Sequence, residues 1–223
     1  AEDTNLTIFQ ELKCSRALID KDAIYSAEGG GAVTSSNLVI GVIQPYTGEY
    51  GISTNPESFA VYGYRKYFSD ANNNVILTEI SSYGMKDFFR DRLSGNSTNF
   101  TTGKIIGGYD IHNSEYVISI QSENTRSETL NFDERATGWV SRFNYYPDQA
   151  FSLRNSFYTV KTVGGDAQLW KHYDPSVPRG SFHGITNKSS ITFVFNPNPT
   201  NSKTFQTIAY EGSNGWQADS FLS

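Results

Sequence analysis

Histidines are the side chains in this sequence best suited to metal binding or to proton transfer near neutral pH. There are three, separated by 60 and 11 positions: His112, His172 and His183. No His-Glu-x-x-His or His-x-His arrangement occurs, and a metal site requires several ligands that converge on one point. Each histidine is followed by a residue typical of turns or strand ends, so we expect surface or capping histidines and no metal centre.

A second candidate is the acidic and amide-rich stretch that begins at Asp70. The spacing Asp-x-Asn-x-Asn over residues 70–74 places oxygen ligands as the first half of a calcium-binding loop does. Val75 and Ser81, however, stand where that loop requires a glycine and a bidentate glutamate. The stretch therefore predicts the turn of a β-hairpin and no calcium site.

Paired carboxylates could cleave glycosidic bonds if two of them flanked a substrate in a cleft. The candidate pairs are Asp87 with Asp91, Asp133 with Glu134, and Asp166 with Asp174. Arginines or polar turn residues surround them, as is typical of solvated surface charge. The sequence has no Gly-x-Ser-x-Gly elbow and no phosphate-binding loop, and its single cysteine, Cys14, is typical of a small buried residue. We therefore expect no catalytic, cofactor-binding or metal-ligating residues and no enzyme.

Aromatic side chains offer a further kind of chemistry, because exposed rings can bind the faces of sugars. Three tryptophans have tyrosines nearby in the sequence: Trp139, Trp170 and Trp216, with Tyr145, Tyr146, Tyr173 and Tyr210. Cores of β-proteins are also rich in such residues, so the pattern favours packing within the core and between chains. A carbohydrate-binding module of a receptor-binding or cell-surface protein is the alternative, and a glycan-cleaving enzyme is the weaker one.

The overall composition indicates the class of fold. The chain has 223 residues, with 14 Tyr, 15 Phe and 19 Gly but one Met, so aromatic and β-branched residues supply the apolar positions and turn residues separate them. Its net charge of −5 argues against a nucleic-acid platform. No stretch approaches the roughly 18 apolar residues of a transmembrane helix. We predict an all-β protein.

Runs with the pattern of strands recur along the chain, with turns between them. The clearest pairs are residues 59–68 with 75–80, across a turn at 69–74, and 104–110 with 115–121, across a turn at 111–114. Further runs lie at 6–9, 16–19, 23–25, 38–43, 138–145, 156–163, 167–173, 191–196, 204–211 and 216–221. One short helix is expected at 83–93, with Ser82 as its N-cap. This spacing predicts antiparallel hairpins, in a β-propeller or part of one, with a β-sandwich as the alternative.

The distribution of turn residues divides the chain in two. Residues 1–58 form a strand-containing but loop-rich extended segment, in which glycine, serine and proline crowd positions 28–58 and only 38–43 resembles a strand. Residues 59–223 form an antiparallel β domain, and the whole is expected to be a fragment of a larger protein. Because long loops are usually functional or interfacial, we expect Gly29–Pro56 to contact neighbouring subunits.

Several segments, taken together, resemble one group of proteins. They are Gly51–Phe59, Tyr67–Asp70, Ile80–Asp91, Ile106–Asp110 with Glu115–Tyr116, and Lys203–Ser213. Similar segments occur in large virion structural proteins of tailed phages, in the crAss-like and marine cyanophage groups. In the former these are described as tail stabilisation, nozzle or muzzle proteins. The resemblance extends from about residue 6 to the end of the chain.

The resemblance implies a structural role. It implies a location in the tail or neck of the virion, a β-propeller within a larger polypeptide, and assembly of identical subunits into a ring around a DNA channel. The partners would be other virion proteins and copies of the same chain, with DNA passing through without sequence-specific binding. No catalytic residue and no cofactor come with the resemblance.

Overall fold

The computed structural model describes residues 5–25, 31–70, 75–76, 80–94, 103–122, 126–196, 198–204, 206–207, 209, 211–212, 215 and 217–220. Contacts divide the chain into two compact units, Ala1–Lys188 and Ser189–Ser223. All helices and strands found among the described residues belong to the first unit. The boundary expected after residue 58 stays a prediction.

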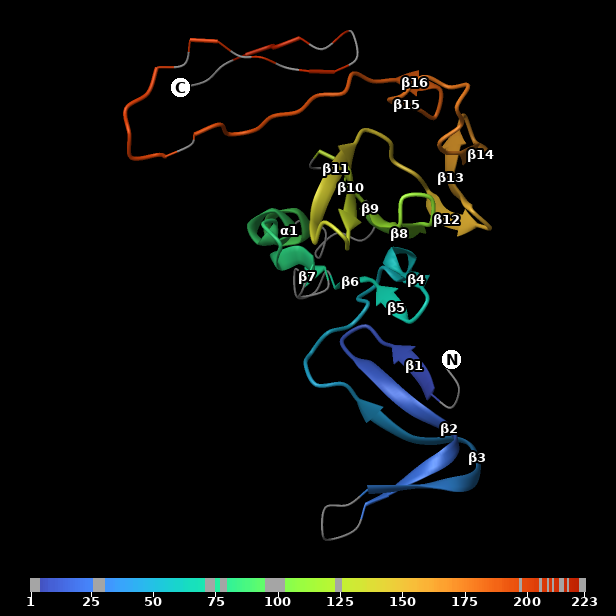
Figure 1. Cartoon of the computed structure of the whole chain (residues 1–223). Helices are drawn as coiled ribbons and strands as arrows, with labels where there is room; N and C mark the ends of the chain where they lie inside the picture. Colours follow the sequence, from blue (N-terminus) through green and yellow to red (C-terminus); the bar gives the residue numbers. More distant parts are fainter. Residues whose placement is uncertain are drawn as a thin grey trace. The chain divides into compact units, whose positions relative to one another are not determined.

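The N-terminal part is a three-stranded antiparallel sheet, drawn in blue in Figure 1. Its strands are β1 (Asn5–Phe9), β2 (Cys14–Tyr25) and β3 (Gly31–Pro45). The expectation that residues 28–58 contain a strand only at 38–43 is wrong, and the short runs expected at 16–19 and 23–25 are parts of one strand. The physical reason is that strand propensity depends on context, since β2 supplies a hydrogen-bonding partner along β3, with two register shifts.

Residues 46–58 follow this sheet, and bends and turns dominate here, as the sequence predicts. The segment ends in a short 3-10 helix, η1 (Pro56–Ser58). The backbone N–H of Gly51 donates to Asp70 Oδ2 at 3.0 Å, and the next N–H donates to the carbonyl of Gln10 at 2.9 Å. Hydrogen bonds therefore fix this loop to the elements on either side of it.

Two small hairpins come next. β4 (Ala60–Tyr62) pairs with β5 (Arg65–Tyr67), and β6 (Ser69–Asp70) pairs with β7 (Val75–Ile76). The run expected as one strand at 59–68 is thus a hairpin, because Gly63 and Tyr64 form a turn. A hairpin across the acidic stretch is confirmed by β6 and β7, but the expected bounds are wrong, because β7 pairs with Ser69 and Asp70 and not with residues 59–68. Residues 71–74 of that turn lie outside the described residues.

A single short α-helix is found among the described residues, as predicted. It is α1 (Lys86–Ser94), and the 3-10 helix η2 (Ile80–Ser82) precedes it. α1 begins later than expected because Tyr83 and Gly84 form a turn, with Gly84 at φ +73°, so Ser82 belongs to η2 and is no cap of α1. In the described part of the chain, no helix has the length and apolar character needed to cross a membrane.

The largest sheet is a four-stranded antiparallel meander in the order β11-β10-β9-β8. Its strands are β8 (Lys104–Asp110), β9 (Glu115–Gln121), β10 (Glu128–Asp133) and β11 (Gly138–Phe143). The β8–β9 hairpin has the bounds that the sequence predicts. β10 escapes prediction because Leu130 and Phe132 are its only apolar residues, and polar residues occupy the other positions.

A three-stranded antiparallel sheet follows: β12 (Gln149–Leu153), β13 (Ser156–Val163) and β14 (Asp166–Lys171). β12 contacts β8 closely, since the Ser152 hydroxyl donates to the Tyr109 carbonyl and a Cβ at Gly108 would lie 2.8 Å from the Cβ of Ala150. A hairpin of β15 (Ser181–Phe182) and β16 (Ile185–Thr186) comes after it. β12 is a further strand that the sequence does not predict, because its five residues alternate without a turn signal of their own.

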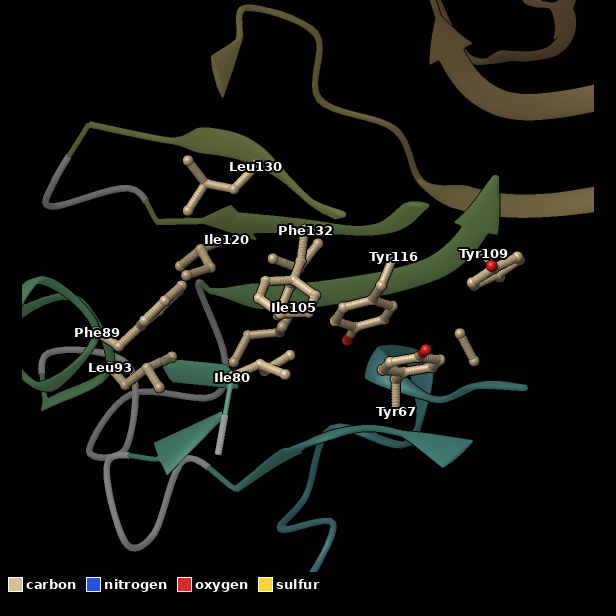
Figure 2. Close-up of a cluster of buried hydrophobic side chains, with 12 residues drawn as sticks. Tyr67, Ile80, Phe89, Leu93, Ile105, Tyr109, Tyr116, Ile120, Leu130 and Phe132 are labelled. Carbon is tan, nitrogen blue, oxygen red and sulfur yellow. The ribbon is translucent and has the colours of Figure 1, made fainter. Parts of the chain in front are cut away.

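Figure 2 shows the main hydrophobic core of the first unit. It consists of Ala60, Tyr67, Ile80, Phe89, Leu93, Ile105, Tyr109, Tyr116, Ile118, Ile120, Leu130 and Phe132. Phe89 and Leu93 point from α1 toward the residues of the four-stranded sheet, and the rings of Tyr67 and Tyr116 stack with centroids 4.7 Å apart. Each large side chain buried in this way stabilises the fold by about 1.5–3 kcal/mol. The helix therefore closes one side of the sheet through its apolar face.

The predicted fold class is confirmed, because the described residues form antiparallel sheets with one short α-helix. Closed barrels are absent from the sheets of the described residues. A propeller is not confirmed by these sheets and stays a prediction. The strands expected at 191–196, 204–211 and 216–221 are wrong as far as these ranges are described, since no described residue after Lys188 lies in a strand.

Candidate assembly surfaces

Two of the three histidines converge on one hydroxyl group, which their spacing in the sequence does not predict. His172 Nε2 lies 2.8 Å and His183 Nε2 lies 2.9 Å from the Thr159 hydroxyl oxygen. A surface position is wrong for His172, which is 9% exposed because the rings of Tyr145 and Phe157 pack on its imidazole. Its backbone N–H donates to the Phe157 carbonyl and extends the β13–β14 pairing. Burial, with a smaller effect of His183, lowers the pKa of His172 to about 4. The third histidine, His112, is exposed as expected.

The residues that were candidates for metal binding form structural contacts instead. Within the residues that the structure describes, no three His, Cys, Asp or Glu side chains gather in a way that could hold a metal ion. Asp70, the first residue of the calcium-like stretch, is buried and accepts the Gly51 N–H. Its carboxylate therefore holds the loop at residues 46–51, and residues 71–74 lie outside the described part of the chain.

Three of the candidate carboxylates are bound by arginines that are near them in the sequence. Asp87 and Asp91 lie 2.7 and 2.9 Å from the Arg90 guanidinium on the exposed face of α1. Asp133 accepts the N–H of Arg135 at 2.8 Å and its guanidinium at 3.1 Å, and these hydrogen bonds lower the pKa of Asp133. Both arrangements are those of surface charge, as the sequence predicts.

The remaining carboxylates also have local roles. Glu134 binds the Arg65 guanidinium and accepts a hydrogen bond from the Tyr67 hydroxyl, which ties the turn after β10 to β5. Asp174 accepts two hydrogen bonds within its own turn, and these lower its pKa. Asp166, at the start of β14, is exposed. These contacts account for Glu134 and Asp174 as turn-stabilising residues.

Sequence reasoning misses a buried carboxylate. Glu128 on β10 is 3% exposed and lies 3.5 Å from the Arg92 guanidinium and 3.4 Å from that of Arg142. Both guanidinium groups also lie over the ring of Phe88, at 5.5 and 5.4 Å from its centroid. This group of charged and aromatic residues joins α1 to β10 and β11. The sequence carries no signal for it, because the charged residues are far apart along the chain.

The tryptophans serve different environments. Trp139 packs on Phe89 and Phe132, with ring centroids 4.7 and 5.3 Å apart, and its indole N–H donates to a backbone carbonyl of η2 at 2.9 Å. Core packing, as expected from the sequence, is therefore confirmed for Trp139. Trp170 is partly buried beside the histidine pair. Trp216 lies outside the described residues.

An open pocket of about 280 Å³ lies beside the β1–β2 hairpin. Four aromatic residues line it, together with threonines, a glycine, a lysine and a cysteine: Phe9, Tyr46, Tyr50, Phe68, Thr7, Thr47, Gly48, Lys66 and Cys14. Cys14 is half-buried, and burial together with a nearby carboxylate raises the pKa of its thiol. A protonated thiol is a poor nucleophile, so this pocket is suited to contact with apolar groups and not to covalent chemistry.

Exposed apolar side chains occur on three parts of the described chain. On β3 they are Ile40, Val42 and Ile43; on β12 and β14 they are Phe151, Leu153 and Leu169; in the second unit they are Ile191, Phe193 and Val194. The last three belong to the segment Ile191–Asn196, hereafter the C-terminal run. Groups of exposed apolar residues commonly mark sites of protein–protein contact.

In the described residues, the fold is β-rich, the polar candidates form turns and buried hydrogen bonds, and several apolar side chains are exposed. Residues 177–223 match the family model described as the Crassvirus muzzle protein C-terminal domain. No curated protein and no solved structure matches the chain significantly.

Over residues 177–223, this match confirms the expected resemblance to muzzle-type tail proteins of crAss-like phages. The match supports a crassvirus tail or muzzle protein and places the chain in the tail or neck of the virion. Residues 177–223 are hereafter called the muzzle domain, after the family model that they match. That domain includes the β15–β16 hairpin and the C-terminal run. The inferred resemblance to marine cyanophage proteins has no such support and stays a prediction.

Proposed function

We propose that this chain is a nozzle-type subunit of the crassvirus tail or neck, which builds a ring with copies of itself and acts by assembly and not by catalysis. The family match gives the coarser part: a structural component of the phage virion that assembles with other virion proteins. The nozzle-type role, the ring and the non-catalytic action are the proposal.

The observation that carries the proposal is the exposure of the C-terminal run. Ile191, Phe193 and Val194 are 71, 70 and 93% exposed, and all three lie within the matched domain. Burial of each such side chain is favourable by about 1.5–3 kcal/mol. A contact with a neighbouring subunit would supply that burial, because the centre of a protein interface is apolar and rich in aromatic residues.

The composition of the C-terminal run also suits a particular kind of contact. Its sequence, Ile-Thr-Phe-Val-Phe-Asn, is that of a strand, yet none of its residues lies in one. The backbone groups of such a segment pair readily with the exposed edge of a sheet in another chain. This supports assembly in which the run adds a strand to a neighbouring protein.

A second contact is expected on β3, within the segment Gly29–Pro56. Ile40 and Ile43 are 51 and 54% exposed there. Deleting the whole segment would also remove the pairing partner of β2, so the substitution Ile43→Asp is the cleaner test. The variant should stay folded and fail to assemble; unfolding would instead assign Ile43 to the core.

The non-catalytic part of the proposal is supported by the polar side chains. Asp133, Glu134 and Asp174 are engaged in turns, and Asp70 fixes a loop. The expected passage of DNA without sequence-specific binding is supported by the net charge of −5, since an acidic subunit gains little from phosphate contacts.

The experiment combines particles and purified protein. Peptide mass spectrometry on purified virions should find this chain at a fixed number of copies per particle, and sedimentation of the full chain should show an oligomer of one size. Absence from intact particles would reject the structural role. A monomer at every concentration, in a chain that is present in particles, would reject the self-assembled ring alone.

A further inference from the structure

The tip of the β15–β16 hairpin consists of His183 and Gly184. Both have positive φ angles, +49° and +78°, and they connect the paired residues Phe182 and Ile185. Two successive positive φ angles are those of a type I′ turn, for which Asn-Gly is a preferred pair. His183 occupies the position where asparagine is preferred, which suggests that its imidazole has a role of its own.

The His183 side chain fastens the hairpin to the three-stranded sheet. Its Nε2 lies 2.9 Å from the Thr159 hydroxyl on β13, and its ring centroid lies 5.6 Å from that of Trp170 on β14. The adjacent Phe182 packs on Tyr145, with ring centroids 4.9 Å apart. One hydrogen bond and one ring contact therefore hold the tip on the sheet, and Phe182 adds a contact with Tyr145 before β12.

Thr159 is fully buried and shares its hydroxyl with His172, whose Nε2 is 2.8 Å away. A hydroxyl has one proton, so at neutral pH it donates to one imidazole and accepts from the other. A single charged ring can still donate to the hydroxyl. If both rings are charged, the hydroxyl proton loses its acceptor, and two positive rings face each other with centroids 6.3 Å apart. The cluster thus tolerates at most one added proton with every hydrogen bond kept.

The charged groups around His183 come from two elements. Burial lowers the pKa of His183, Lys161 on β13 lowers it further, and Asp148 acts in the opposite direction. Partial burial raises the pKa of Asp148. Its contacts with Lys104 and with the Thr162 N–H outweigh burial and lower this pKa to about 2. It therefore stays charged in mild acid.

The surroundings of His172 are mostly aromatic. Its ring lies 5.1 Å from the rings of both Tyr145 and Phe157 and 5.9 Å from that of Tyr173. Burial raises the pKa of both tyrosines, so they stay neutral, and the Tyr173 hydroxyl donates to Asp110. The Asp110 carboxylate therefore forms its hydrogen bond with Tyr173 and not with His172.

We propose that His172, Thr159 and His183 form an acid-sensitive latch, closed at neutral pH, that holds the first hairpin of the muzzle domain on the β12–β13–β14 sheet. Protonation of the pair opens the latch and releases the tip of the hairpin. This device goes beyond structural assembly, because it makes the attachment of the muzzle domain depend on pH.

The direction of the pH effect follows from linkage. Both imidazoles have a pKa below the ordinary 6.5 when the latch is closed. The closed form is therefore fully favoured above pH 6.5 and loses stability as the pH falls from 6.5 toward the value of about 4 for His172. The lowered pKa of His172 alone raises the equilibrium constant for opening of the latch on the order of 20-fold between pH 7 and pH 5.

The test is an NMR titration of the full chain between about pH 7.5 and pH 4.5, the range in which histidines change charge. It follows the histidine rings and the hydrogen exchange of the Trp170 indole N–H, a buried donor next to the hairpin tip. We expect its protection, corrected for intrinsic exchange, to fall on the order of 20-fold from pH 7 to pH 5. The Trp139 indole N–H, bonded in the core, is the internal control and keeps its protection.

Matched variants separate the latch from general unfolding. His183→Asn keeps the residue preferred at this turn position and removes the imidazole, so the response to pH should become weaker while the hairpin stays folded. His172→Asn combined with His183→Asn should abolish the response. The proposal is overturned if Trp170 stays protected while both histidines become charged, or if the double variant loses protection as the native chain does.

Discussion

The β8–β9 hairpin and the C-terminal run have similar sequence patterns and opposite environments. Both alternate apolar β-formers with other residues. On β9, Tyr116 and Ile118 are fully buried, whereas Phe193 and Val194 in the run are 70 and 93% exposed. Strand-forming sequence is therefore present in both places, but among the described residues only the hairpin forms strands.

The two segments differ in whether a neighbouring strand is available within the same hairpin. β8 and β9 are joined by a short turn at residues 111–114, so each finds its partner within the same hairpin. The C-terminal run lies in no strand of the described residues. Because strand propensity reflects packing against neighbours more than backbone preference, this difference is the basis of the proposed contact between the run and another chain.

The largest effect is expected from removal of a core ring. Phe89→Ala deletes a fully buried side chain that packs on Trp139, and it should lower the free energy of unfolding by about 3–5 kcal/mol. The matched change Phe193→Ala should cost at most about 0.5 kcal/mol. Urea unfolding of both variants measures the difference. Equal losses would show that the run is part of the core.

A smaller effect is expected from a methyl group added to β8. A Cβ at Gly107 would lie 1.9 Å from the backbone carbonyl oxygen of Ser58, so Gly107→Ala must displace η1 and should cost about 1–3 kcal/mol. Gly138→Ala on β11, whose nearest atom would be 3.7 Å away, is the control and should be nearly neutral. Thermal unfolding of the two variants decides; similar melting temperatures would contradict the close contact of β8 with η1.

An effect of similar or smaller size is expected from a charge at the start of the three-stranded sheet. Hydrogen bonds from Lys104 and Thr162 lower the pKa of Asp148 to about 2. The carboxylate therefore stabilises the fold above its ordinary pKa near 3.8, and this stabilisation disappears as the pH falls from 3.8 toward 2. Asp148→Asn should lose about 1–2 kcal/mol at pH 6 and show a flatter dependence of unfolding free energy between pH 5 and pH 2. An unchanged slope in that window would rule out this role.

The smallest effect on stability, and the largest on assembly, is expected from Val194→Asp. The side chain is 93% exposed, so the free energy of unfolding should change by about 0.5 kcal/mol or less. Incorporation into particles should fall, because a charge would be buried at the proposed contact. Competition between native and variant chains during virion assembly measures this, with Ser202→Asp in the same unit as control. Equal incorporation of both variants would argue against the contact.

Part of the fold is predictable because its signals are local. The β8–β9 hairpin has matching alternation on both sides of a turn at residues 111–114, and the spacing of Phe89 and Leu93 fits one face of a helix. β10 and β12 are not predictable in the same way, since β10 lies between two strands that supply its pairing. The reverse error occurs at 191–196, where the sequence has the pattern of a strand and the structure has none.

The histidine cluster is a site that could not be predicted from the sequence. His172 and His183 are separated along the chain by a turn and the start of a hairpin, and nothing local indicates that both reach Thr159. The only available signal is the His183–Gly184 pair, a residue sequence compatible with a type I′ turn. Convergence through tertiary contacts of this kind becomes visible only once the sheet and the hairpin are in place.

The most direct test of the central claim is lysine-specific cross-linking of intact, purified particles followed by mass spectrometry. Lys203 lies in the second unit, within the matched domain and near the C-terminal run, with its Nζ 2.7 Å from the Asn198 carbonyl. Assembly through the muzzle domain predicts cross-links from Lys203 to peptides of other virion proteins, or a link between Lys203 and Lys203, which only two copies of the chain can form. Cross-links from Lys203 to its own chain alone, in particles that contain the protein, would contradict it.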